Sequence, residues 1–172
     1  SGKVNDVGAY TRANVASSVR MGVELEGGGR ITQWVQASAN LTLSRNRIKD
    51  FTEFYDDYDN GGQKFVVHGS TDIAFSPSIS GAGTKGIIPT KNFELSLLGK
   101  YVDRQHLDNT ASKARSLDPY YVQDARLIYT LQNLLVKEAS LIFQVNNIFN
   151  RKYEPNGYTY SYQSGGDLVT EN

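Results

Sequence analysis

Hydrophobic and polar side chains alternate along much of the chain, with the period of two that a β-strand requires. The clearest run covers residues 33–47, where hydrophobic residues at the odd positions 35–43 face one side and polar residues at the even positions 36–44 face the other. The same pattern predicts strands at 17–28, 65–77, 91–104, 120–131 and 139–147. We find no amphipathic helix of useful length. The chain is therefore expected to be all-β, with six antiparallel strands in an up-and-down order.

The segments between these strands are predicted to be loops and turns, and their lengths differ at the two ends of the hairpins. Residues 1–16 form the end of a loop, Gly27-Gly-Gly29 makes a tight turn, and residues 78–90 form a Ser/Gly/Ala connection. Long polar loops are predicted at 48–64, 105–119 and 148–172, all at one end of the hairpins. The turns at 29–32 and 132–138, at the other end, are shorter. This asymmetry is typical of outer-membrane barrels, in which the long loops are extracellular.

The two faces of these strands differ in charge. The polar face is predicted to carry Arg20, Glu24, Glu26, Asp72, Glu94, Lys100, Asp124 and Arg126. In a soluble β-sandwich such a face is the wet surface. In a membrane barrel it lines a polar lumen, and the apolar face meets lipid. The pattern fits both, but Tyr101, Tyr120, Tyr121 and Phe149 fall near the same ends of successive strands, and such an aromatic girdle favours the barrel.

Composition narrows the possible classes of function. The 172 residues include no Cys, which removes disulfide and thiolate chemistry, and 18 basic against 18 acidic residues argue against a nucleic-acid partner. No apolar run is long enough for a membrane helix, although membrane strands need only about 9–11 residues. Ser1-Gly2-Lys3 does not lead into a signal peptide, so we expect the natural protein to begin earlier.

Two groups of polar residues were considered as metal or catalytic sites. The acidic loop from Asp56 to Gly62 resembles a calcium loop, but His68 stands where the EF-hand pattern needs a Glu. A hydrated acidic loop is the favoured interpretation. The histidines, His68 and His106, lie far apart on different elements and complete no catalytic triad. We therefore expect no metal, no cofactor and no catalytic residue.

Aromatic residues in the loops are the best candidates for ligand binding. Tyrosine combines a stacking surface with a hydroxyl group, which suits the capture of a bulky polar ligand. The candidates are Phe51, Phe54, Tyr55, Tyr58, Tyr153, Tyr158 and Tyr160. For any single one, packing within a girdle or loop is the alternative role. We select Tyr58 and Tyr158 as the predicted ligand contacts.

Three stretches resemble one protein family in the same order along the chain. Asn146-Asn-Ile-Phe-Asn-Arg-Lys-Tyr153, followed by Asn156-Gly-Tyr158-Thr-Tyr160, is similar to the segment before the last strand of TonB-dependent outer-membrane receptors. Gly2-Lys-Val-Asn-Asp-Val-Gly-Ala-Tyr10, leading to Gly22-Val-Glu-Leu-Glu26, resembles one barrel hairpin of that family. Gly99-Lys-Tyr101 through His106-Leu-Asp-Asn109 to Ser116-Leu-Asp-Pro-Tyr120 resembles another.

This resemblance implies that residues 1–172 are the C-terminal section of a transmembrane barrel of about 22 strands. The plug domain and a final strand after Asn172 would lie outside this section. The family imports a scarce ligand (a metal–siderophore, a cobalamin or a glycan) across the bacterial outer membrane. Its partners are the TonB–ExbB–ExbD complex, outer-membrane lipid and the small-molecule ligand; it is not an enzyme. Two alternatives remain: a complete small outer-membrane barrel of about eight strands, and a soluble β-sandwich binding module.

Overall fold

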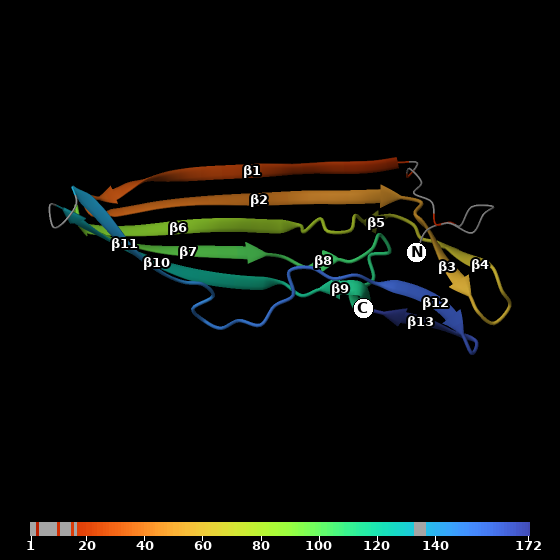
Figure 1. The fold of residues 1–172 in the computed structure, drawn as a ribbon. Helices are drawn as coiled ribbons and strands as arrows, with labels where there is room; N and C mark the ends of the chain where they lie inside the picture. The colour runs from red at the N-terminus through yellow and green to blue at the C-terminus, as the bar shows by residue number, and fades with distance from the viewer. Residues whose placement is uncertain (1–2, 4–9, 11–14, 16, 133–136) are drawn as a thin grey trace.

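The computed structural model describes residues 3, 10, 15, 17–132 and 137–172, and it is all-β. Its main feature is a large antiparallel sheet of six long strands, in the order β1-β2-β6-β7-β10-β11, with the short β5 paired to β2 (Figure 1). The long strands are β1 Ser17–Thr32, β2 Val35–Lys49, β6 Ile79–Thr90, β7 Phe93–Val102, β10 Tyr120–Gln132 and β11 Glu138–Val145. Among the described strands the sheet is open, because β1 and β11 stand at its two edges.

A second, smaller sheet lies beyond one end of the large one (Figure 1). Its order is β13-β12-β3-β4, in which β12 runs parallel to β3 and the other pairs are antiparallel. The remaining short elements are β3 Thr52–Asp57, β4 Gln63–Val67, β5 Thr71–Asp72, β8 Gln105–His106, the 3-10 helix η1 Lys113–Arg115, β9 Ser116–Leu117, β12 Tyr160–Ser164 and β13 Asp167–Glu171. These elements occupy the connections at the long-loop end.

The pairing of the strands gathers the hydrophobic side chains on one face. Directly paired residues of antiparallel strands point to the same side of a sheet. The row Ala37–Lys85–Leu97–Ala125–Val145 crosses five strands, and the row Leu41–Gly81–Tyr101–Tyr121 crosses four. Leu25 of β1 pairs with Leu41, so the first strand continues the same face. We call this side the apolar face; the predicted alternation of five strands is thus confirmed in one common register.

The apolar face is not covered by any other described part of the chain. Met21, Val23 and Leu25 are 56–59% exposed, and Leu141 and Phe143 are 61% and 67% exposed. The total accessible surface is 11947 Å², whereas a compact protein of this mass exposes about 8,400 Å². No large side chain among the described residues is fully buried. Both faces of the large sheet are therefore accessible, and among the described residues no second layer packs on it to close a core.

One of the six predicted strands is wrong. Residues 65–77 hold only part of β4 and β5, and the third long strand is β6, which lies in the predicted 78–90 connection. Positive φ at Phe75 (50°) and the following Pro77 interrupt the predicted run. The pattern concealed β6 because Gly81 and Gly83 occupy positions on its apolar face, where a strand normally shows large side chains.

The predicted turn at Gly27-Gly-Gly29 is also wrong, because β1 continues to Thr32. These glycines pair with Ala39, Ser38 and Ala37 of β2 inside the ladder. A Cβ on Gly28 would lie 2.9 Å from the Ser38 Cβ, so the close approach of the two strands requires glycine there. The actual turn falls at residues 33–34.

The structure separates the long connections from the short turns by their position on the large sheet. The connections 50–78 and 103–119 lie at one end of the large sheet, and the turns 33–34 and 91–92 lie at the other (Figure 1). The segment 146–159 runs past the β10 edge toward the end with the long connections. The predicted loops 48–64 and 148–172 are not irregular throughout, because they contain β3, part of β4, and the β12–β13 hairpin. Most of the predicted 1–16 loop and residues 133–136 of the predicted 132–138 turn lie outside the described residues.

Two side chains lie on the opposite face from the one expected. Tyr121 pairs with Tyr101 on the apolar face, but Tyr120 points to the other side, is 7% exposed and stacks on Tyr153 at 4.5 Å. Asp72 belongs to β5, not to a long strand, and pairs with Arg47 on the apolar face. Neighbouring residues of a strand face opposite ways, so of the residues predicted for a girdle Tyr101 and Tyr121 share the apolar face and Tyr120 does not.

Candidate functional site

Four tyrosines form a line on the smaller sheet. Tyr160 and Tyr162 lie two residues apart on β12 and therefore share a face, with ring centroids 6.0 Å apart. Tyr58, from the turn after β3, approaches Tyr162 at 5.3 Å. Tyr158 precedes β12 and lies two residues before Tyr160. We call Tyr58, Tyr158, Tyr160 and Tyr162 the tyrosine row; Tyr58 and Tyr158 are its most exposed members, at 69% and 74%.

One carboxylate organises the centre of this row. Glu171 of β13 pairs with Tyr160 across the hairpin. Its two carboxylate oxygens accept hydrogen bonds from the hydroxyl groups of Tyr160 and Tyr162, the latter at 3.0 Å. The hydrogen bond to Glu171 raises the pKa of Tyr160 to about 12, and a similar bond raises the pKa of Tyr162. The same two bonds lower the pKa of Glu171. Tyr160 and Tyr162 are therefore neutral phenols beside one ionised carboxylate.

The β3–β4 and β12–β13 hairpins, which carry the tyrosine row, are joined by strand pairing and by side-chain contacts. β12 pairs with β3 through Tyr162–Asp56 and Gln163–Asp57. The Lys64 ammonium of β4 donates to the Gln163 side-chain oxygen at 2.8 Å and lies 3.0 Å from the Asp57 carboxylate. These contacts hold residues about a hundred positions apart at a fixed spacing, which a stacking surface requires.

Asp57 closes the turn that presents Tyr58. Its carboxylate accepts the Asn60 side-chain amide at 3.0 Å, the Asn60 backbone N–H at 3.2 Å and the Asp59 backbone N–H at 3.1 Å. Hydrogen bonds from Asn60 and then Lys64 lower the pKa of Asp57 to about 2. This carboxylate, which belongs to the acidic loop from Asp56 to Gly62, is thus engaged by an amide and an ammonium group. Among the described residues no three His, Asp or Glu side chains gather as metal ligands.

A buried cluster around Arg115 joins β3, the 103–119 connection and β13. The Arg115 side chain, 7% exposed, donates through Nη1 to Glu53 of β3 and, at 3.0 Å, to Asp108. It reaches Thr170 of β13 through Nη2 at 3.1 Å. His68 contacts the other Glu53 oxygen at 2.9 Å. Burial alone would lower the pKa of Arg115, but Glu53 and Asp108 outweigh it and raise the pKa.

The other aromatic candidates mostly have packing roles. Phe51 stacks on His68 at 6.0 Å, Phe54 lies 6.2 Å from Phe65, and Tyr55 is only 9% exposed. Tyr153 stacks on the buried Tyr120. Of the predicted set, Tyr58, Tyr158 and Tyr160 thus come together on one surface. Sequence reasoning missed Glu171 and had not singled out Tyr162, although the alternation of Tyr158, Tyr160 and Tyr162 was a visible signal for a common face.

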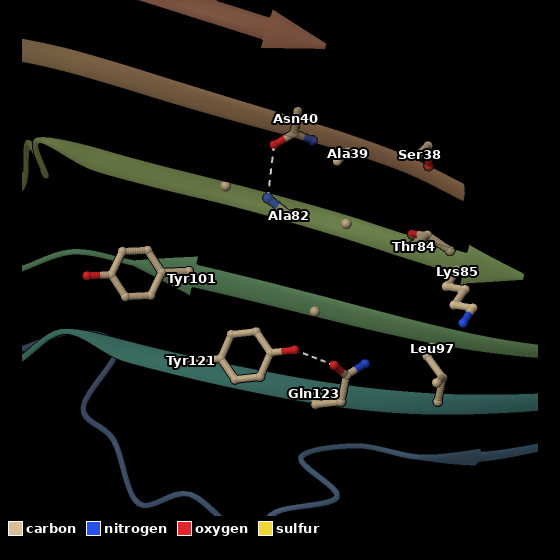
Figure 2. A pocket seen from close by; sticks show the side chains of 13 residues that line it. Ser38, Ala39, Asn40, Ala82, Thr84, Lys85, Leu97, Tyr101, Tyr121 and Gln123 are labelled. Atoms are coloured by element: carbon tan, nitrogen blue, oxygen red, sulfur yellow. Dashed lines mark hydrogen bonds between the residues drawn. The ribbon is translucent and has the colours of Figure 1, made fainter. Parts of the chain in front are cut away.

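A hollow of about 530 Å³ lies on the large sheet, where small residues replace large ones (Figure 2). Most of its lining belongs to the apolar face, including Ala39, Gly83 and Gly99. Tyr121 leans over Gly99, where a Cβ would lie 2.7 Å from the Tyr121 hydroxyl oxygen, and donates to Gln123. Besides its tyrosines, the one ionisable side chain in the lining of the hollow is Lys85, and no His, Asp or Glu lines it.

Comparison with known proteins adds no assignment. No protein-family model matches this chain, no curated protein matches it, and no solved structure matches its fold. In the part of the chain that the structure describes, no helix has both the length and the apolar character needed to cross a membrane.

Proposed function

We propose that this chain is the C-terminal section of the barrel wall of a TonB-dependent outer-membrane receptor. In this proposal the apolar face of the large sheet contacts lipid, and the opposite face lines the lumen. The tyrosine row lies on the extracellular side and captures the ligand. The observation that carries the proposal is the common register of the six long strands, which places their hydrophobic side chains on one uncovered face.

The dimensions of the sheet support a membrane location. β6, β7 and β10 contain 12, 10 and 13 residues, and a transmembrane strand needs about 9–11. On the apolar face the aromatic pair Tyr101–Tyr121 lies near the long loops, and the pair Phe93–Tyr129 lies near the short turns. These pairs are separated by about 26 Å along β7. Two aromatic levels that bracket an apolar band are typical of a membrane barrel.

The opposite face supports the lumen assignment. Glu24, Glu94, Lys100, Asp124 and Arg126 occupy the register positions that alternate with the apolar set. A sheet with one hydrophobic and one charged face needs a nonpolar phase on one side and water on the other. A barrel wall meets both requirements.

The receptor identity rests on the resemblance of the three sequence stretches described above. It brings the expectation of a barrel of about 22 strands, a plug, and energy supplied by TonB–ExbB–ExbD. The tyrosine row suits a bulky ligand with both flat and polar surfaces, such as a metal–siderophore, a cobalamin or a glycan. Capture by these loops is expected to need no covalent chemistry.

Spin labels on the two faces of β1 test the membrane location. Leu25→Cys and Glu24→Cys in the full-length protein place labels at neighbouring positions on opposite faces; this chain has no Cys of its own. In a lipid bilayer we expect the Leu25→Cys label to be relaxed by lipid-dissolved oxygen and the Glu24→Cys label by a water-soluble nickel chelate. Equal access of the nickel chelate to both labels would refute the membrane proposal. A Leu25→Cys label shielded from both agents would indicate a sandwich core.

Uptake tests the receptor function separately. Cells that express the full-length protein would be offered three labelled probes: a ferric siderophore, cyanocobalamin and a maltodextrin. We expect one of the three to accumulate, and accumulation to stop when TonB is deleted. Accumulation without TonB would instead favour a passive barrel. Accumulation of none of the probes would reject the ligand classes proposed here.

A further inference from the structure

Three cations continue the apolar face of β2 at its long-loop end. Arg45, Arg47 and Lys49 follow Leu41 and Leu43 at every second position, so they share the side occupied by those leucines. We call Arg45, Arg47 and Lys49 the cationic rim. β2 ends beside the long loops (Figure 1), so the rim stands at the border between the apolar band and the loops.

The rim is only partly neutralised within the described residues. Its partners across the ladder on β1 are Met21, Val19 and Ser17, none of which is acidic. The Arg47 Nε forms an ion pair with Asp72 at 3.1 Å, and the His106 Nε2 lies 3.7 Å from the same carboxylate. Arg45 and Lys49 are exposed, and no acidic side chain among the described residues forms an ion pair with either.

We infer that the cationic rim binds the phosphate-bearing headgroup of an anionic lipid, whose acyl chains lie against the apolar face. This inference rests on the proposed membrane location. Charge complementarity identifies the headgroup, because three cations face one carboxylate over a span of about 13 Å along β2. Val19 and Met21, 45% and 59% exposed beside the rim, identify the occupant as an amphiphile rather than a soluble anion.

Arginine at two of the three positions suits this ligand. Its planar guanidinium donates two parallel hydrogen bonds to a phosphate, and Lys49 adds a point charge. Arg47 retains Nη2 for this purpose, since Nε faces Asp72 and Nη1 donates to the Ser70 carbonyl at 3.4 Å. A cation near an anionic lipid surface strengthens binding by about fivefold. The rim would therefore select phosphate lipids from a mixed bilayer and fix the height of β2 in the membrane.

Lipid retention in nanodiscs tests the inference. The full-length protein would be placed in phosphatidylcholine discs containing a minor fraction of phosphatidylglycerol, and the lipids retained after release would be counted by native mass spectrometry. We expect wild-type protein to retain phosphatidylglycerol selectively. Arg45→Gln/Lys49→Gln should weaken that retention by about fivefold for each cation removed.

Arg20→Gln is the matched control, because Arg20 lies at the same height on the opposite face and bonds Ser76 at 3.1 Å. It should retain phosphatidylglycerol as wild type does. Equal retention by wild type and the double variant overturns the lipid site, leaving an acidic protein partner as the next candidate for the rim. Failure of the wild-type protein to enter discs of any composition overturns the membrane proposal as well, so the two failures are distinguishable.

Discussion

The carboxylate of Asp59 holds the turn at Gly165, accepting the backbone N–H of Gly165 at 2.7 Å and that of Gly166 at 2.8 Å. Both glycines have positive φ, 65° and 86°, which turns their N–H groups toward one point. A residue in the β3–β4 turn thereby caps the β12–β13 turn. The contact fixes the ends of the two hairpins that carry the tyrosine row.

Removing this cap should loosen the β12–β13 turn. Asp59→Ala leaves two N–H groups without their charged acceptor, and we expect amide hydrogen exchange in residues 160–171 to accelerate by about tenfold. Asp59→Asn retains one acceptor oxygen and should have a smaller effect. Glu154→Ala, at an exposed acidic residue outside both hairpins, is the control. Unchanged exchange in Asp59→Ala would show that strand pairing alone holds the turn.

The Arg115 cluster should be the main source of stability in the loops. Arg115→Met leaves the buried Glu53 carboxylate without its cation, which is expected to cost about 3–5 kcal/mol in local opening. Hydrogen exchange in residues 52–57 and 113–117 should accelerate at least a hundredfold, whereas exchange in residues 93–102 should not change.

A second substitution separates lost charge from lost packing. Arg115→Met combined with Glu53→Leu removes both charges and should open less readily than Arg115→Met alone. Asp108→Asn, at a 27% exposed side chain, should cost less than either. If the double variant opened as readily as the single one, the unpaired Glu53 charge would not be the cause.

Acid should release the turn that presents Tyr58. The pKa of Asp57 is about 2 in the folded state and 3.8 without these contacts. The folded state therefore holds the proton more weakly, and the stabilisation is complete above about pH 4 and is lost as pH falls toward 2. Protection of the amides of residues 57–63 from hydrogen exchange, taken relative to the intrinsic rate at each pH, should fall over that window. In Asp57→Asn the fall should be absent, and protection should already be low at neutral pH.

Alkali should remove the stabilisation by the Tyr160–Glu171 pair, whereas acid removes the stabilisation by Asp57. The pKa of Tyr160 is raised from 10.0 to about 12, so the unfolded hairpin loses the phenol proton first. Stabilisation by this pair is complete below about pH 10 and is lost as pH rises through 12. An ultraviolet titration of tyrosinate should show a late-ionising component that Glu171→Gln moves to lower pH. A titration identical in wild type and Glu171→Gln would contradict the assigned cause.

The exposed ends of the tyrosine row should carry the ligand contacts. Tyr58→Ala and Tyr158→Ala should each weaken binding of whichever uptake probe is accepted by about tenfold, because buried aromatic contacts often exceed 1 kcal/mol. Tyr58→Phe should bind nearly as wild type if stacking dominates. Tyr129→Ala, on the apolar face at the short-turn end, should have no effect on affinity. Full affinity in both alanine variants would remove the row as a ligand site.

The sequence by itself determined most of the large sheet. Alternation along β1, β2, β7, β10 and β11 is a local property, because a side chain's face depends only on whether its position is odd or even. It also indicated which end of the sheet carries the long loops. It failed at β6, where glycines remove the hydrophobic signal, and at Gly27-Gly-Gly29, where strand proximity rather than a turn requires glycine.

Only the tertiary structure decided the site. The sequence pointed to Tyr58, Tyr158 and Tyr160 only as separate candidates. The approach of Tyr58 to Tyr162, the Asp59 cap and the Arg115–Glu53 contact join residues 62 to 107 positions apart. Such contacts depend on how loops fold over one another, and no local period encodes that. The register likewise decided that six separate hydrophobic stripes form one face, since a shift of one residue in any strand would have sent its stripe to the other side.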